Sequence, residues 1–196
     1  AALGGALSPL LFDTGLLAAP YPKLFRRRTL GGLRFDDRLQ INEDVLFNIQ
    51  FLQNTPAIYC LHGVYYKQYD MESGSLSRRL RGDLLDAEAV TRPVLEAFLT
   101  DAKLPAPEID RLVQISRVRA ALNQYGLLTG CPGRMPFAQR RQLFARILQD
   151  ADARAALRAR LTADPNRLLA LPYRLGVFLH SAWLLAAYTQ LKNRFL

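Results

Sequence analysis

The spacing of apolar residues predicts that most of this chain is helical. From about residue 79 onward, apolar residues recur every three or four positions among helix-forming residues, which is the pattern of amphipathic helices. Prolines and short polar stretches divide this part into separate segments. The predicted helices span residues 83–100 (capped by Asp83 and kinked at Pro93), 108–125, 137–149 and 151–161, followed by a last helical segment from 165 to 196.

The first 78 residues show a different pattern, in which one helix lies among shorter elements. Asn42 is a good helix N-cap, and the apolar residues between 45 and 52 have helical spacing. Short extended or strand-like pieces are predicted where β-branched and aromatic residues gather, at 33–35, 57–61 and 64–69. The sequence therefore predicts an α+β chain that is predominantly helical, with a domain boundary between residues 78 and 79.

Composition and charge narrow the classes of partner. Half of the 196 residues are hydrophobic, which is enough for a folded core. The formal net charge is +9, and 22 of the 26 basic residues are arginine. Such a charge favours phosphates, nucleotides, acidic lipid headgroups or nucleic acid, although an arginine-rich and alanine-rich composition also arises from genome bias. The arginines are scattered through helices without a recognition motif, so we expect no nucleic-acid partner.

The two cysteines and the first residues bear on the compartment. Cys60 and Cys131 are far apart in sequence and show neither a disulfide framework nor metal-ligand spacing, which fits a reducing cytosol. Residues 1–11 are apolar but lack the basic start of a signal peptide. The chain begins in mid-pattern without an initiator methionine, so we expect it to be a fragment of a longer protein.

The last segment, residues 165–196, is apolar enough that a membrane-spanning or membrane-bound helix has to be considered. Its longest charge-free run, residues 175–191, has seventeen residues, whereas a membrane span needs about twenty apolar ones. Arg174 and Lys192 flank this run, and Trp183 lies within it. Two interpretations remain open: a buried helix packed on the preceding helices, or a helix within 165–196 that lies in an anionic membrane interface.

The adjacent acids Glu43 and Asp44 are the strongest candidates for chemistry. Acidic residues in the first turn of a helix interact favourably with its dipole, and this common structural role needs no further function. A carboxylate in this place can also act as the general base that takes a proton from an attacking hydroxyl. Backbone N–H groups at the helix start would hold it rigidly and lower its pKa.

Five short motifs resemble, in the same order, motifs of the bacterial family 2 glycosyltransferases, which are written KLYRR, RF, EDxxF, YYYR and SGSxS. Residues 20–80 carry the resemblance, with departures at Pro22, where the family often has Asn, and at Lys67, where it has Arg. The motifs in this chain are Lys23-Leu24-Phe25-Arg26-Arg27, Leu33-Arg34-Phe35, Glu43-Asp44-Val45-Leu46-Phe47, Val64-Tyr65-Tyr66-Lys67 and Ser73-Gly74-Ser75-Leu76-Ser77.

The resemblance implies a fold of GT-A type, of which residues 1–78 would be the acceptor-side part and 79–196 a helical C-terminal domain. It implies a hexosyltransferase-like enzyme of surface-polysaccharide assembly, which moves a sugar from a nucleotide-diphosphate donor to a glycan or lipid-linked acceptor. Asp44 would be the catalytic base, and Glu43 would support it or orient the acceptor. The residues that would bind substrate are Lys23, Arg26, Tyr66, Lys67, Ser75 and Ser77.

The donor-binding half that the resemblance implies has no counterpart in this sequence. No βαβ pattern precedes residue 20. The one Asp-x-Asp match, Asp150-Ala151-Asp152, lies between helical runs and is predicted to be a solvated helix start. Mg²⁺ or Mn²⁺ is expected in the intact enzyme, but no metal ligand is assigned in this chain. We expect the isolated chain to be inactive and the enzyme to be cytoplasmic, peripheral on the inner face of the cell membrane.

The alternative hypothesis is a module without catalytic activity. In that case the basic helical part, residues 79–196, would dock on an anionic membrane surface or a protein partner. His62 and His180 have no spacing of a zinc site, and neither a nucleophile elbow nor a phosphate-binding glycine loop occurs in the sequence.

Overall fold

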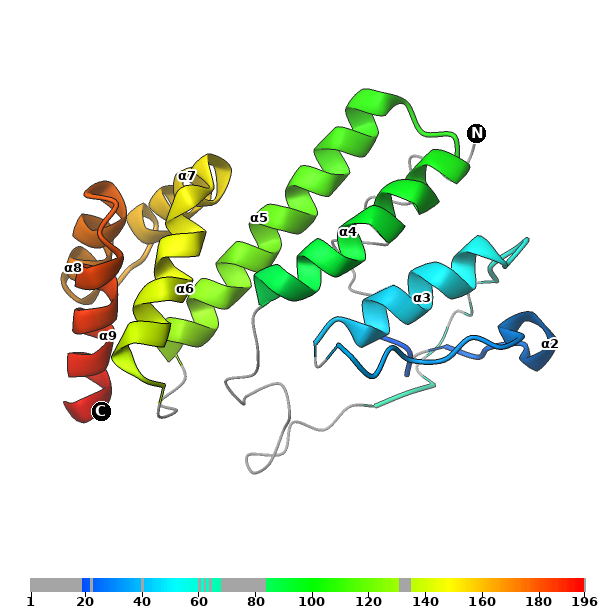
Figure 1. Cartoon of the computed structure of the whole chain (residues 1–196), viewed down its shortest axis with the longest axis horizontal. Helices are drawn as coiled ribbons and strands as arrows, with labels where there is room; N and C mark the ends of the chain where they lie inside the picture. Colours follow the sequence, from blue (N-terminus) through cyan, green and yellow to red (C-terminus); the bar gives the residue numbers. More distant parts are fainter. Residues whose placement is uncertain are drawn as a thin grey trace. The chain divides into compact units, whose positions relative to one another are not determined.

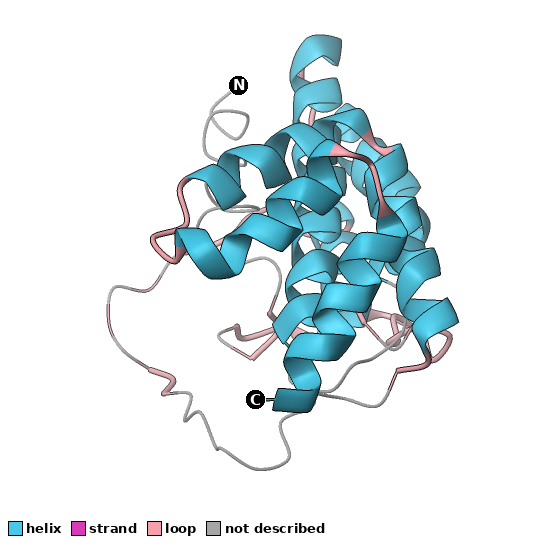
Figure 2. Ribbon diagram, turned by 90° about the vertical axis from the view of Figure 1, so that its left-hand side faces the viewer, coloured by secondary structure: helices cyan, strands magenta, loops and turns pink. Residues whose placement is uncertain are grey.

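Every regular element in the described part of the chain is an α-helix (Figures 1 and 2). A computed structural model describes residues 19–21, 23–39, 41–59, 61, 63, 65–67, 84–130 and 135–195. Its helices are α2 (Arg27–Leu30), α3 (Glu43–Gln53), α4 (Leu84–Asp101), α5 (Ala106–Gly130), α6 (Phe137–Gln149), α7 (Ala151–Thr162), α8 (Arg167–Phe178) and α9 (Ala182–Phe195). The predicted predominance of helix is confirmed.

The short strands predicted in the first part of the chain are not observed in the residues that the structure describes. Residues 33–35 and the described residues of 57–61 and 64–69 form no strand, and all except Leu33 are exposed. A strand needs a neighbour to pair its N–H and C=O groups, and the described segments contain no such neighbour. Their content of β-branched and aromatic residues therefore does not produce a sheet there.

Most predicted helix bounds in the second part agree with the structure. The helices α4, α6 and α7 begin and end within one residue of the predicted ranges. Pro93 lies inside α4, which continues through it. The predicted cap Asp83 lies outside the described residues. Helix α5 continues five residues beyond the predicted end, through Gly126 to Gly130.

The predicted last segment consists of two helices rather than one. His180 has φ 52 and closes α8 in a Schellman motif, in which the Ser181 N–H donates to Gly176 O (2.8 Å) and the His180 N–H to Val177 O (3.3 Å). The Ser181 Oγ then accepts from the Leu184 N–H at 3.2 Å, which caps α9. The charge-free run therefore turns back on itself after α8.

No helix among the described residues is long and apolar enough to cross a bilayer.

Packing divides the chain into two compact units, which we describe separately. Unit 1 contains the described residues up to 67 together with Asp86–Ser116, and unit 2 contains Leu84, Leu85 and the described residues from Arg117 onward. This division differs from the boundary that the sequence pattern predicts after residue 78. The reason is that α4 and the first half of α5 share a core with α3, formed by Ile49, Leu95, Phe98, Leu99, Leu104 and Leu112.

Unit 2 is a helical assembly around a large buried core. The second half of α5 and helices α6 to α9 contribute to it. Tyr125 lies at the centre of an aromatic group, with its ring edge-on to Phe144 (5.9 Å between centroids) and to Tyr173 (6.0 Å). Other core residues that are fully buried are Leu128, Ile147, Leu157, Val177 and Leu185.

Helices α8 and α9 approach each other closely at Gly176. A Cβ at this position would lie 2.7 Å from Leu185 Cγ and closer still to Cδ2. Leu185 is fully buried among other core residues, so its side chain cannot turn out into solvent. Because Gly is here the only residue that fits without displacement, the close packing of α8 on α9 depends on it.

We expect Gly176→Ala to lower the free energy of unfolding by about 1–2 kcal/mol, because overpacking against Leu185 outweighs the gain in helix propensity. The matched control is Gly126→Ala in α5, where a Cβ would meet nothing within 4 Å. That variant should gain about 0.5–1 kcal/mol. Urea denaturation followed by circular dichroism measures both, and a stabilised Gly176→Ala variant would contradict the close approach.

Candidate functional site

Helix α3 places the two candidate carboxylates in its first turn. It begins at Glu43, and Asn42 occupies the predicted N-cap position. The predicted capping hydrogen bond is not formed, since Asn42 has a left-handed backbone (φ 65, ψ 10) rather than the extended one that directs an N-cap side chain to the first turn. The helix start is fixed instead by the backbone, where the Leu46 N–H donates to Asn42 O at 3.0 Å.

Four phenylalanines pack two preceding segments, residues 23–27 and 33–35, against α3. Phe25 lies edge-on to Phe47 (5.6 Å) and to Phe51 (4.8 Å). Phe35 stacks on the Phe47 ring, with 4.3 Å between ring centroids. Phe47 and Phe51 are buried, and Phe25 and Phe35 of the two preceding segments pack against them. This aromatic cluster was not predicted from the sequence, and the signal that could have indicated it is the i, i+4 spacing of Phe47 and Phe51 on one helix face.

The cluster brings Lys23 within electrostatic reach of Asp44. Burial lowers the pKa of Lys23 to about 8, and the negative charge of Asp44 partly opposes this shift. Burial and the neighbouring Glu43 raise the pKa of Asp44, and the charge of Lys23 partly opposes that shift. The Lys23 Nζ also donates a hydrogen bond to the carbonyl oxygen of Ala19.

The predicted direction of the Asp44 pKa shift was wrong. Backbone N–H groups at the helix start were expected to lower this pKa, whereas it is raised. Partial burial removes water from the carboxylate, and the charge of Glu43 next to it disfavours a second negative charge. A raised pKa makes Asp44 a stronger base than an ordinary aspartate.

A stacked pair of tyrosines connects the motif Val64-Tyr65-Tyr66-Lys67 to this site. The ring of Tyr66 stacks on that of Tyr21, with 4.9 Å between ring centroids. Tyr21 lies two residues before Lys23. Both rings remain about half exposed, 48% each. Arg26 and Lys67 are exposed. Ser75 and Ser77 lie outside the described residues.

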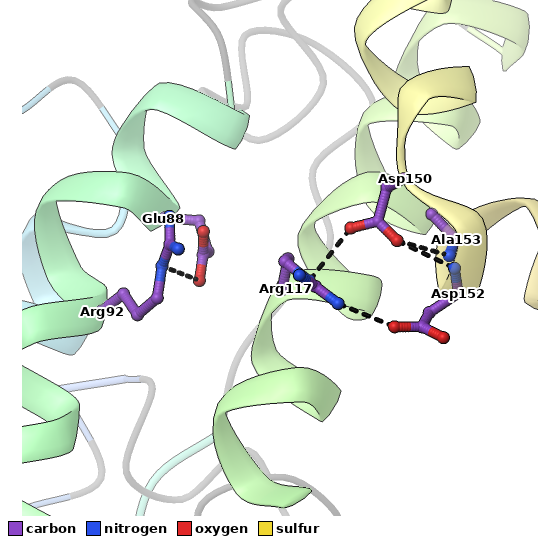
Figure 3. Close-up of polar contacts among 6 residues, drawn as sticks. All are labelled: Glu88, Arg92, Arg117, Asp150, Asp152 and Ala153. Atoms are coloured by element: carbon purple, nitrogen blue, oxygen red, sulfur yellow. Dashed lines mark hydrogen bonds and ion pairs between the residues drawn. The ribbon is translucent and has the colours of Figure 1, made fainter. Parts of the chain in front are cut away.

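The Asp-x-Asp match belongs to unit 2 and has a structural role. The Asp150 carboxylate accepts from the N–H groups of Asp152 (2.9 Å) and Ala153 (3.0 Å), which caps α7 as predicted. It is not simply solvated, however, because Arg117 pairs with Asp150 at 3.0 Å and with Asp152 at 2.7 Å (Figure 3). These two carboxylates therefore share one guanidinium as their ion-pair partner.

A second ion pair was not foreseen from the sequence. Glu88 and Arg92 on α4 lie four residues apart, and their side chains approach to 3.3 Å (Figure 3). Glu88 is buried, so the arginine compensates a carboxylate that has lost most of its water. The i, i+4 spacing of the two charges was the sequence feature that could have predicted it.

The described residues contain no group of three or more metal-ligating side chains. Comparison of the chain with protein-family models, with curated proteins and with solved structures finds no match.

Proposed function

We propose that this chain is the acceptor-side part of a glycosyltransferase of GT-A type. It would move a sugar from a nucleotide-diphosphate donor to a glycan or lipid-linked acceptor in surface-polysaccharide assembly. The observation that supports this most is the proximity of Lys23 and Asp44, because these residues of two separate motifs of the resemblance are both partly buried and each charge acts on the pKa of the other.

In the proposed reaction, Asp44 takes the proton from the acceptor hydroxyl as that oxygen attacks the anomeric carbon. The bond from this carbon to the diphosphate oxygen breaks, and the nucleoside diphosphate leaves with the electron pair. Glu43 keeps the pKa of Asp44 high and orients the acceptor. Lys23, charged below pH 8, stabilises the ionised Asp44 or the diphosphate.

No group of three or more metal-ligating side chains occurs among the described residues, so no ligand for Mg²⁺ or Mn²⁺ is assigned. Glu43 and Asp44 lie together with the positive charge of Lys23 near Asp44. The pair Asp150 and Asp152 is held by Arg117. The proposed step is derived from the protein groups that the structure describes.

The pH dependence of the reaction tests the coupled pair. We expect kcat/KM of the native protein to fall on the acid side at a pH above the ordinary Asp value of 3.8, because Asp44 must be ionised. It should fall on the alkaline side near pH 8, where Lys23 loses its proton. In Lys23→Arg the alkaline limb should disappear, since arginine stays charged in this range.

The control for this experiment is Lys103→Arg, an exposed lysine that follows α4. Its pH profile should match that of the unsubstituted protein. An alkaline limb that persists unchanged in Lys23→Arg would show that Lys23 has no part in the reaction. The assay follows transfer of radiolabelled sugar from a panel of nucleotide-sugars by the protein purified from its native host.

A second candidate function is a basic helical module without catalysis, which docks on an anionic membrane or a protein partner. The observation that favours it is the exposure of Leu171, Leu175 and Phe178 on α8 together with the exposed Arg174. Either function fits a cytoplasmic protein that is peripheral on the inner face of the cell membrane. Sugar transfer by the native protein would decide for the enzyme, and failure with every nucleotide-sugar would favour the module.

A further inference from the structure

Helix α8 in unit 2 is apolar on two opposite faces. Its inner face carries Ala170, Tyr173 and Val177, which are buried in the core of unit 2. Its outer face carries Leu171, Leu175 and Phe178, of which 48%, 45% and 68% of the surface is exposed. Three large apolar residues exposed on one side of a helix often mark an interaction site, so this outer face needs an explanation.

Two further exposed apolar residues follow α8 in the sequence. Leu179, in the turn, is 61% exposed, and Trp183 in the first turn of α9 is 59% exposed. The indole of Trp183 contacts Phe137 of α6 edge-on, with 6.4 Å between centroids. We call Leu171, Leu175, Phe178, Leu179 and Trp183 the α8 apolar surface.

Cationic groups lie within and next to this surface. Arg174 is exposed and shares the outer face of α8, since it stands three residues after Leu171 and four before Phe178. The guanidinium of Arg158 on α7 lies 5.8 Å from the centre of the Phe178 ring. The same guanidinium is 3.3 Å from His180 Nε2 in the turn after α8. A bound partner would therefore meet apolar side chains and positive charge together.

The charge of the chain is concentrated in the same part. Residues 117–196 contain thirteen lysines or arginines and three acidic residues, a formal net charge of +10. Residues 1–116 contain thirteen basic and fourteen acidic residues, a formal net charge of −1. Two of the three acids, Asp150 and Asp152, are paired with Arg117. The positive charge around the α8 apolar surface is therefore little compensated within unit 2.

We propose that the α8 apolar surface, with Arg158 and Arg174, docks on the surface of an anionic lipid bilayer. The leucines, Phe178 and Trp183 would enter the boundary between headgroups and acyl chains, while the arginines contact lipid phosphates. A second copy of the chain would bring another strongly positive surface to the same place, which charge repulsion disfavours. A nucleic acid would satisfy the arginines but would leave the leucines in contact with water.

The docking is interfacial because α8 has only twelve residues. A helix of that length lies parallel to the membrane plane rather than across it. The inference concerns lipid binding and stands independently of the glycosyltransferase proposal, since its test has no catalytic readout.

The test is co-sedimentation of the 196-residue chain with phosphatidylcholine vesicles that contain or lack phosphatidylglycerol. We expect binding only to the anionic vesicles, and release by salt. Phe178→Ser should bind about tenfold more weakly, because it removes a large apolar side chain from the interface. Arg158→Gln and Arg174→Gln should each weaken binding about fivefold.

The matched control is Val90→Ser on α4, an apolar side chain in unit 1 that is 46% exposed. It should bind as the unsubstituted chain does. Because all the substituted side chains are exposed, the variants should retain the helical circular dichroism spectrum. Failure to bind anionic vesicles, equal binding to neutral ones, or unchanged binding of Phe178→Ser would each overturn the proposal. So would a dimer in solution that Phe178→Ser dissociates, because a second copy would then cover this face.

Discussion

Replacement of Asp44 by Asn is expected to lower kcat for sugar transfer by about 10²–10⁴-fold, with little change in KM. The amide has nearly the shape of the carboxylate but cannot accept the proton of the acceptor hydroxyl. The measurement is the initial rate of the native protein at saturating donor and acceptor. The control is Asp37→Asn, an exposed acid of unit 1 whose replacement should leave the rate unchanged. Unchanged turnover of the Asp44 variant would refute the assignment of the base.

A substitution of Glu43 distinguishes the catalytic base from the residue that supports it. Glu43 raises the pKa of Asp44 through its charge, so Glu43→Gln should shift the acid limb of the pH profile to lower pH. Its turnover near neutral pH should fall less than that of Asp44→Asn, because Asp44 stays ionised there. The opposite order of losses would mean that Glu43 is the base and Asp44 the supporting group.

Replacement of Phe144 by Ala is expected to lower the free energy of unfolding by about 3–5 kcal/mol. The side chain is fully buried in unit 2 and packs edge-on against Tyr125. Truncation would remove most of its apolar contacts and leave a cavity among helices that are fixed by other core residues. Urea denaturation monitored by helical circular dichroism measures the loss.

The control for this prediction is Phe178→Ala. The same side chain is removed there from an exposed position on α8, so stability should change by no more than about 0.5 kcal/mol. Similar losses in the two variants would mean that the buried packing around Phe144 is not as the structure shows. A loss below about 1 kcal/mol in Phe144→Ala would lead to the same conclusion.

The helices could be predicted from the sequence where periodic apolar residues and punctuation agree. Pro136 precedes α6, and Asp150 ends it and caps α7, so both helices were located within one residue. The break between α8 and α9 was missed because neither Gly nor Pro marks it. His180 adopts the left-handed conformation that Gly usually provides, and backbone hydrogen bonds rather than residue type stabilise the turn.

The candidate site could be predicted in part. The helical start at Glu43 and Asp44 follows from apolar spacing, and the structure confirms it. The approach of Lys23 does not follow from local pattern, because it depends on how Phe25 packs against Phe47 and Phe51 of α3. The pKa of Asp44 could not be predicted either, since its direction depends on burial, which is a property of the tertiary structure.

Trp183 is an intrinsic fluorescent probe of its own surroundings. Trp183 is the only tryptophan of the chain and is 59% exposed, beside the ring of Phe137. The tryptophan fluorescence of this chain therefore comes from one known place, and an indole in water emits at longer wavelength than one in apolar surroundings. Any contact that covers the start of α9 should therefore move the emission to shorter wavelength, without a label attached to the chain.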